Sequence, residues 1–166
     1  FGESLIHSDS HKSTLFCFVE RKAGEMTSRV HMTEISAPPQ GANKLKKVSE
    51  ITYSPDVPND FPVFMHISSK HGLLYIMSKF GHLFIYELTT GSLLFRQAIS
   101  AESVFIGTRN SITDGIFVIN RSGSLITASI DENNYIPYFL TSCSHIPDNA
   151  TIAFKLASRF FFLPNN

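Results

Sequence analysis

Seven histidines are the residues of this sequence best suited to metal binding or acid–base chemistry. His7 and His11 stand four positions apart with Asp9 between them, a spacing that could bind zinc if it lay on a helix. Their segment, HSDSHKS, has the polar composition of a turn, and no cysteine or second histidine pair completes a ligand set. The remaining histidines stand in or beside expected strands, or alone. We therefore predict no metal site.

Other catalytic patterns are weak. The sequence contains no glycine-rich phosphate loop and no nucleophile-elbow motif. Serine, histidine and aspartate are too scattered to define a triad, and a turn at a strand end explains the adjacent acids Asp131 and Glu132. The sequence therefore predicts no catalytic residue and no bound cofactor.

Charge and composition disfavour several classes of partner. Lysine plus arginine and aspartate plus glutamate each number 14, so nothing favours nucleic acid or an anionic membrane as a partner. No apolar run approaches the roughly 20 residues that a membrane-spanning helix needs. Cys17 and Cys143 are predicted to be buried free thiols, which suits a reducing compartment.

Short strand-like runs dominate the chain as far as about residue 140. They are rich in Val, Ile, Phe and Tyr and are interrupted by Gly, Pro, Asn and Asp. Because short turns join them, neighbours along the chain are expected to pair antiparallel. The expected strands fall into three sets: 4–6, 13–20, 29–35 and 48–53; 63–67, 73–78, 82–88 and 93–99; 104–107, 116–120 and 124–130.

The second and third sets repeat each other. HGLLYIMSKFGHL at 71–83 aligns with TDGIFVINRSGSL at 113–125, an offset of 42 that superposes Gly81 on Gly123 and Leu83 on Leu125. A four-stranded unit with this period is typical of a propeller blade. Each such sheet is apolar on both faces and must be covered by neighbours, which explains why 73–77 is apolar at nearly every position. An antiparallel sandwich with a chance repeat is the alternative, and a parallel β-helix is a weaker one.

The pattern changes after Pro137, where the chain is expected to leave the sheet for a helical segment. Asp148 could cap this helix, and Pro164 would end it. The phenylalanines at 160–162 would form an exposed apolar cluster that needs a partner or further chain. The positions at helical spacing are Ile152, Lys155, Leu156 and Arg159.

Several segments resemble the amino-terminal domain of the clathrin heavy chain. They are STLFCFVE (13–20), PNDFPVFMHISSKHGLLYIMSKFGHLFIYELTTG (58–91), ISAESVFI (99–106) and GIFVINRSGSLITASIDENNYIPY (115–138). The resemblance implies a mainly β fold, the last three four-stranded antiparallel blades of a seven-bladed β-propeller followed by the start of an α-helical linker. The implied bounds are 1–140 for the partial propeller, with blades at 1–54, 60–100 and 101–140, and 141–166 for the linker. Because three blades cannot close a ring, both end faces are expected to be bare.

The resemblance also implies a function without catalysis. Such a domain lies at the foot of a long α-solenoid leg and binds short linear peptide motifs of endocytic and trafficking adaptors in grooves between blades. Heavy chains trimerise and bind light chains through regions absent here, and the trimers coat vesicles for intracellular protein transport. The implied location is cytoplasmic, peripheral on coated pits and coated vesicles, with membrane association through adaptors. A purely structural propeller segment and, less favoured, a propeller-based hydrolase are the alternatives.

The resemblance places one candidate peptide site in this sequence, between the last two blades. The positions that match it are Phe61, Leu83 and Gln97. The family has an arginine at the position of Ala98, and its loss removes a charge-assisted contact commonly worth about 1.5–3 kcal/mol. Plain blade packing is the alternative role of Phe61 and Leu83.

Overall fold

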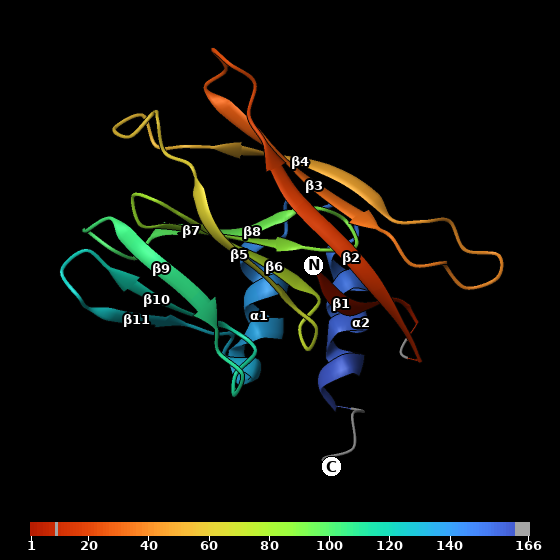
Figure 1. Cartoon of the computed structure of the whole chain (residues 1–166). Helices are drawn as coiled ribbons and strands as arrows, with labels where there is room; N and C mark the ends of the chain where they lie inside the picture. The colour runs from red at the N-terminus through yellow and green to blue at the C-terminus, as the bar shows by residue number, and fades with distance from the viewer. Residues whose placement is uncertain (9, 162–166) are drawn as a thin grey trace.

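The chain folds into three small sheets followed by two helices (Figure 1). The computed structural model describes residues 1–8 and 10–161. The first sheet consists of β1 (Gly2–Ser8), β2 (His11–Glu20), β3 (Thr27–Glu34) and β4 (Lys46–Thr52). The second consists of β5 (Pro62–Ser68), β6 (Leu73–Ser78), β7 (His82–Glu87) and β8 (Leu93–Ala98). The third sheet and the helices are β9 (Val104–Arg109), β10 (Ile116–Asn120), β11 (Leu125–Ala128), α1 (Glu132–Ser142) and α2 (Asn149–Phe161).

Each sheet is an antiparallel meander whose strands pair in chain order. The first strands of successive sheets approach one another, since β1 contacts β5 and β5 contacts β9. Small sheets that share a side in this way are arranged like the blades of a propeller. The structure confirms the predicted fold class, a mainly β partial propeller with a helical segment.

The second sheet is buried on both faces, and this property explains its sequence. All six residues of β6 are buried. Leu73, Tyr75 and Met77 lie in a core shared with the third sheet and both helices. Leu74 and Ile76 lie in a second core, shared with the first sheet. Because side chains alternate between the two faces of a strand, a strand covered on both sides must be apolar throughout.

The β6–β7 and β10–β11 turns have the same geometry at the predicted offset of 42 residues. Gly81 and Gly123 both have a left-handed φ, of 86° and 84°. At the start of each turn a polar side chain accepts the amide hydrogen bond of the residue four positions later, over 3.0 Å to Ser78 and 2.9 Å to Asn120. The repeat is therefore one of turn structure as well as of residue type.

The outer faces of the first and third sheets carry exposed apolar side chains. At the first sheet, Phe1, just before β1, is 84% exposed, and Phe18 on β2 is 39% exposed. On the third sheet, Ile119 lies between Ile106 and Leu125 across the strands, and the latter two are 56% and 62% exposed. Both ends of the row of blades are thus bare and apolar among the described residues.

The third blade ends earlier than the sequence analysis placed it. The third sheet has three strands in the described part of the chain, and α1 begins at Glu132, so the expected boundary at residue 140 falls inside a helix. Asp131 is the cause, because its carboxylate accepts the backbone N–H of Asn133 and caps the helix. Assigning Asp131 and Glu132 to a simple turn was therefore wrong. Pro137 lies within α1 rather than before a helix.

The second helix begins where the sequence predicted. Asp148 immediately precedes α2 with a φ of 58°, and its backbone carbonyl accepts the N–H of Ile152 over 3.0 Å. Ile152 and Leu156 are buried against α1 and the second sheet. Lys155, on the same helix, donates from Nζ to the carbonyl of Ile6 in β1 over 2.8 Å. The side chains of 159–161 and all of 162–166 lie outside the described residues, as do the predictions made for them.

The two equivalent turn glycines offer a matched test of blade packing. Either Gly81→Ala or Gly123→Ala places a side chain at positive φ, which costs about 1–2 kcal/mol. A Cβ at Gly81 would also lie 2.2 Å from the carbonyl oxygen of Ser100, whereas a Cβ at Gly123 meets no atom within 4 Å. We expect Gly81→Ala to lower the free energy of unfolding by clearly more than Gly123→Ala in chemical denaturation. Equal losses would show that the Ser100 contact does not constrain the turn.

The bare end faces predict that the isolated chain self-associates or is partly disordered. Light scattering should show association that the double change Ile119→Thr and Leu125→Thr reduces. Ile112→Thr is the control, because Ile112 is 89% exposed but lies in the β9–β10 loop. A monodisperse wild-type monomer with a sharp cooperative thermal transition would contradict this prediction.

Candidate functional site

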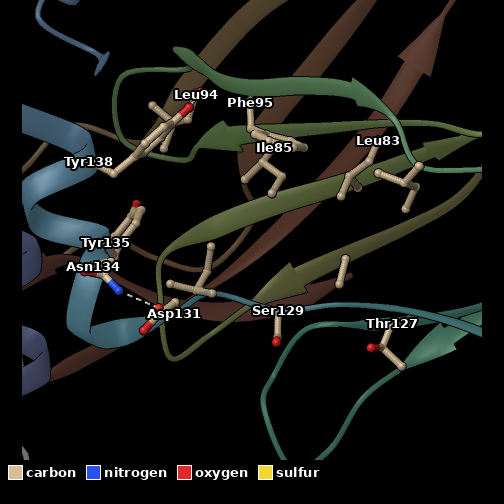
Figure 2. Close-up of a pocket in the computed structure, with 13 residues that line it drawn as sticks. Leu83, Ile85, Leu94, Phe95, Thr127, Ser129, Asp131, Asn134, Tyr135 and Tyr138 are labelled. Atoms are coloured by element: carbon tan, nitrogen blue, oxygen red, sulfur yellow. Dashed lines mark hydrogen bonds between the residues drawn. The ribbon is translucent and has the colours of Figure 1, made fainter. Parts of the chain in front are cut away.

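An open groove of about 500 Å³ lies between the second sheet, the end of the third sheet and α1 (Figure 2). The wall from the second sheet is apolar, and the segment 127–130 forms the opposite side. Helix α1 closes one end with Tyr135 and Tyr138. The apolar residues of the first wall are Leu83, Ile85, Leu94, Phe95 and Ile99.

The charged side chain of the groove, Asp131, lies at the end nearest α1. Asn134 donates from its amide to the Asp131 carboxylate over 2.7 Å, as Figure 2 shows. Hydrogen bonds from the Asn134 side chain and the Asn133 amide lower the pKa of Asp131, so this end carries a negative charge at neutral pH. Tyr138 lines this end of the groove, and its hydroxyl donates to the carbonyl of Leu94 over 3.3 Å. This geometry suits an extended apolar segment with a donor or a cation at one end.

Only one of the three predicted site residues lines this groove. Leu83 lines the groove but is only 2% exposed. Gln97 is its cross-strand neighbour on β8, exposed and outside the lining. Phe61 lies just before β5, where it is 48% exposed and its carbonyl accepts the amide of Lys79. The structure therefore brings Leu83 and Gln97 together and leaves Phe61 outside this groove, while Ala98 faces His82 in the adjacent register.

The helical wall of the groove was not predicted from the sequence. Tyr135 and Tyr138 were assigned to the end of the third blade, although they belong to α1. The available signal was Asp131 as a helix cap, followed by Tyr135 and Phe139 four positions apart on one buried face.

A buried aspartate organises the corner of the second sheet. Asp60 is 0% exposed and accepts the Ser78 hydroxyl over 2.6 Å. It also accepts the backbone amides of Phe61 and Phe80 over 2.9 and 3.0 Å. His82 Nδ1 lies 3.2 Å from the same carboxylate. Asp60 thus fixes the entry to β5 against the β6–β7 turn.

A second buried aspartate joins the second and third sheets. Asp114 accepts the hydroxyl of Ser68 and the amide of Lys70, both over 2.9 Å. Its other carboxylate oxygen lies 3.0 Å from Arg109 Nε and 3.2 Å from His66 Nε2. Burial opposes ionisation, but these hydrogen bonds and charges prevail and lower the pKa of Asp114.

Asp114 stands where the preceding blade has a glycine. It has a φ of 54°, and Gly72, 42 positions earlier, has a φ of 67°. Aspartate tolerates the left-handed region better than most residues, but the conformation still costs free energy. The contacts with the second sheet compensate for this cost.

Ser68, His71 and Glu132 form an arrangement that resembles a hydrolase triad in residue type. His71 Nδ1 lies 3.0 Å from Ser68 Oγ, and Nε2 lies 3.0 Å from Glu132 Oε1. Ser68 and His71 are both 0% exposed, however, so a substrate cannot reach the hydroxyl. The arrangement is structural, and it brings together residues that spacing along the sequence could not associate.

One of the candidate zinc ligands at the start of the chain, His7, is paired with a carboxylate. His7 Nε2 lies 2.8 Å from Glu34, a carboxylate that also accepts the amide of Leu45. Burial opposes ionisation of Glu34, but Ser13, His7 and the Leu45 amide prevail and lower its pKa to about 2. Asp9 lies outside the described residues, and those that are described hold no cluster of three or more metal-binding side chains.

Both cysteines are free, as predicted. Cys143 is buried at the end of α1, whereas Cys17 is only half-buried. Burial raises the pKa of Cys17 to about 12 and also raises the pKa of Cys143, so neither is a reactive thiolate at neutral pH.

The chain is similar to clathrin heavy chains over nearly its whole length, although no protein-family model matches it. The clathrin heavy chain of Drosophila melanogaster is 31% identical over 160 residues, and clathrin heavy chain 1 of Arabidopsis thaliana 33% over 161. Clathrin heavy chain 2 of Homo sapiens is 30% identical over 160. Each alignment covers 96% of this chain but only 9% of the relative's length.

The three antiparallel blades and the two helices that follow them define a segment of a β-propeller protein. The chain is a homologue of clathrin heavy chains, as the resemblance predicted. Neither helix has, within the described residues, the length and apolar character that crossing a membrane requires.

Asp114 provides a test of how the second and third sheets are joined. Asp114→Ala loses every carboxylate contact and keeps the positive φ, so we expect it to lower the free energy of unfolding by about 2–4 kcal/mol. Asparagine keeps an acceptor oxygen and tolerates the positive φ. Asp114→Asn should therefore lower the free energy of unfolding by less than Asp114→Ala does. Chemical denaturation at neutral pH measures both, and a loss from Asn as large as that from Ala would contradict this account.

Proposed function

We propose that this chain is a non-enzymatic segment of a vesicle-coat protein of the clathrin heavy chain type. In this proposal its blades form part of a propeller that binds short linear motifs of endocytic and trafficking adaptors. Assembly with other heavy chains and with light chains would use regions outside this sequence. The protein would act in the cytoplasm, peripherally on coated pits and coated vesicles, in intracellular protein transport. Homology to clathrin heavy chains supports this role.

The groove beside α1 is the observation that supports peptide binding. It is open, has a volume of about 500 Å³ and is walled mainly by apolar side chains. Backbone groups at the edge of β11 and the Asp131 carboxylate supply polar contacts. An extended peptide places alternate side chains on one side, which matches a long apolar wall facing a strand edge.

We place the contact surface on Tyr138 and Phe95 together with Leu83. Tyr138 is 40% exposed, whereas Leu83 can contribute only its outermost atoms. Gln97 and Phe61 remain proposed contacts, although neither lines the groove. Because Ala98 offers no charge, binding here would depend on apolar contacts and on Asp131 rather than on an arginine.

A purely structural role is the second candidate, and one observation favours it. Leu83, Tyr135 and Phe139 share a core with Ile152 and Leu156 of α2, so the same residues fasten the helices to the blades. In this case the segment would connect propeller and helices without binding a ligand of its own.

Two exposed residues of α1 allow an experiment that distinguishes peptide binding from a purely structural role. Tyr138 and Leu140 are 40% and 43% exposed, but only Tyr138 lines the groove. In the full-length chain, we expect Tyr138→Ala to weaken binding of a fluorescent adaptor peptide by about tenfold or more, as truncating an aromatic anchor commonly does. Leu140→Ala should bind like wild type.

Fluorescence anisotropy titrations measure both variants. Equal affinity for wild type and Tyr138→Ala would contradict binding in this groove. Absence of saturable binding by any form of the protein would favour the structural role.

A further inference from the structure

A second open hollow lies where the β6–β7 turn and the β10–β11 turn meet the start of β9. We call it the turn hollow; its volume is about 630 Å³, and it shares no lining residue with the groove beside α1. Phe105 and Ile119 contribute apolar side chains to its lining, and Lys79 and Arg121 contribute positive charges. None of the described residues that line it is acidic. The turn hollow therefore combines apolar surface with a local excess of positive charge.

The two cations occupy equivalent positions in consecutive blades. Lys79 and Arg121 are 42 residues apart, which is the offset at which the two turns superpose. The amide of Lys79 donates to the carbonyl of Phe61, just before β5, over 2.8 Å. The amide of Arg121 donates to the carbonyl of Ser103, just before β9, over 2.7 Å. The structural repeat thus places a cationic residue at the same corner of each blade.

The start of β9 joins these two corners. The Val104 amide donates to the carbonyl of Lys79 over 2.8 Å, and Lys79 Nζ donates to the carbonyl of Val104 over 2.8 Å. Because Arg121 is bound to the adjacent Ser103, both cations are attached to neighbouring residues of one segment, and Phe105 follows next in the chain. An ammonium group has three N–H donors, so Lys79 keeps donors for a ligand.

Buried polar side chains fix both turns. Asp60 is 0% exposed and accepts the backbone amide of Phe80 in the β6–β7 turn over 3.0 Å. Asn120 is 7% exposed and accepts the backbone amide of Ser124 in the β10–β11 turn over 2.9 Å. A ligand that binds the two cations therefore does not have to order the backbone that carries them, which lowers the entropic cost of binding.

Charge complementarity and exposure indicate the chemistry of the ligand. The Lys–Glu and Arg–Asp ion pairs of the described residues are formed by Lys70 and Arg109, not by the two cations of the turn hollow. Phe105 is 76% exposed and Ile119 39%. Positive charges beside an exposed aromatic ring suit an acidic segment that carries a bulky apolar side chain. A membrane surface is a poorer match, because basic clusters that bind anionic lipids commonly hold about 4–8 lysines and arginines.

We propose that the turn hollow is a docking site for an acidic linear peptide segment with a bulky apolar side chain. The apolar side chain packs on Phe105 and Ile119. The carboxylates of the segment face Lys79 Nζ and the Arg121 guanidinium, whose planar fork can donate two parallel hydrogen bonds to one carboxylate. This site is separate from the groove beside α1 and does not depend on peptide binding there.

Fluorescence anisotropy with the full-length chain tests this proposal. The probe is a fluorescein-labelled peptide of about ten residues in which glutamates surround a central phenylalanine, and a matched peptide has glutamines in their place. We expect saturable binding of the glutamate peptide, about fivefold or more tighter than that of the glutamine peptide. Added salt should weaken it, because exposed charges are screened.

Three variants locate the binding. Arg121→Gln removes an exposed charge and keeps the backbone contact with Ser103, so we expect it to weaken binding of the glutamate peptide by about threefold or more. Phe105→Ala should weaken it by about tenfold, as loss of an aromatic anchor commonly does. Arg96→Gln is the control, because Arg96 is an exposed arginine on β8 that does not line the turn hollow. It should bind like wild type.

The proposal is overturned if the glutamate peptide shows no saturable binding or binds no more tightly than the glutamine peptide. It is overturned as well if Arg121→Gln or Phe105→Ala binds like Arg96→Gln. Loss of binding in Tyr138→Ala would place the acidic peptide in the groove beside α1, which contradicts this proposal but not peptide binding in that groove. Binding to phosphatidylserine vesicles without binding to the peptide would also contradict it.

Discussion

The second sheet has no face that can be left to water, and the rest of the structure depends on covering it. Leu74, Ile76, Phe84 and Tyr86 require the first sheet on one side. The opposite side chains require the third sheet and both helices. A small sheet with two apolar faces is unstable alone, so stacking of similar sheets is the way in which such a sequence folds.

Buried carboxylates hold the corners at which the blades meet. Asp60 and Asp114 accept backbone amides and hydroxyls from segments far apart in the chain. Glu34 and Glu87 each end the third strand of their sheet. Their carboxylates accept backbone amides from the turn that follows. Loops at the corners cannot use the strand ladder, so these carboxylates supply the partners that their amides need.

The sequence was sufficient to predict the blades but not their ending or the groove. The offset that superposes Gly81 on Gly123 is local and is preserved as turn geometry. The start of α1 was missed because polar residues and Pro137 hide a helix whose only clear signal is Asp131 as cap. The groove and the Ser68–His71–Glu132 chain unite residues from separate sheets and a helix, and pairings of this kind leave no trace in spacing. Phe61 and Gln97, assigned by resemblance alone, are not among the residues that line the groove.

Adjacent leucines of β6 test most directly whether the second sheet is covered on both faces. Leu73 and Leu74 are each 0% exposed, but they belong to different cores. In the full-length chain, Leu73→Ala and Leu74→Ala should each lower the free energy of unfolding by about 2–5 kcal/mol, the cost of a cavity in a packed core. If either change is tolerated at little cost, that face is open to solvent, and the account of stacked blades is contradicted.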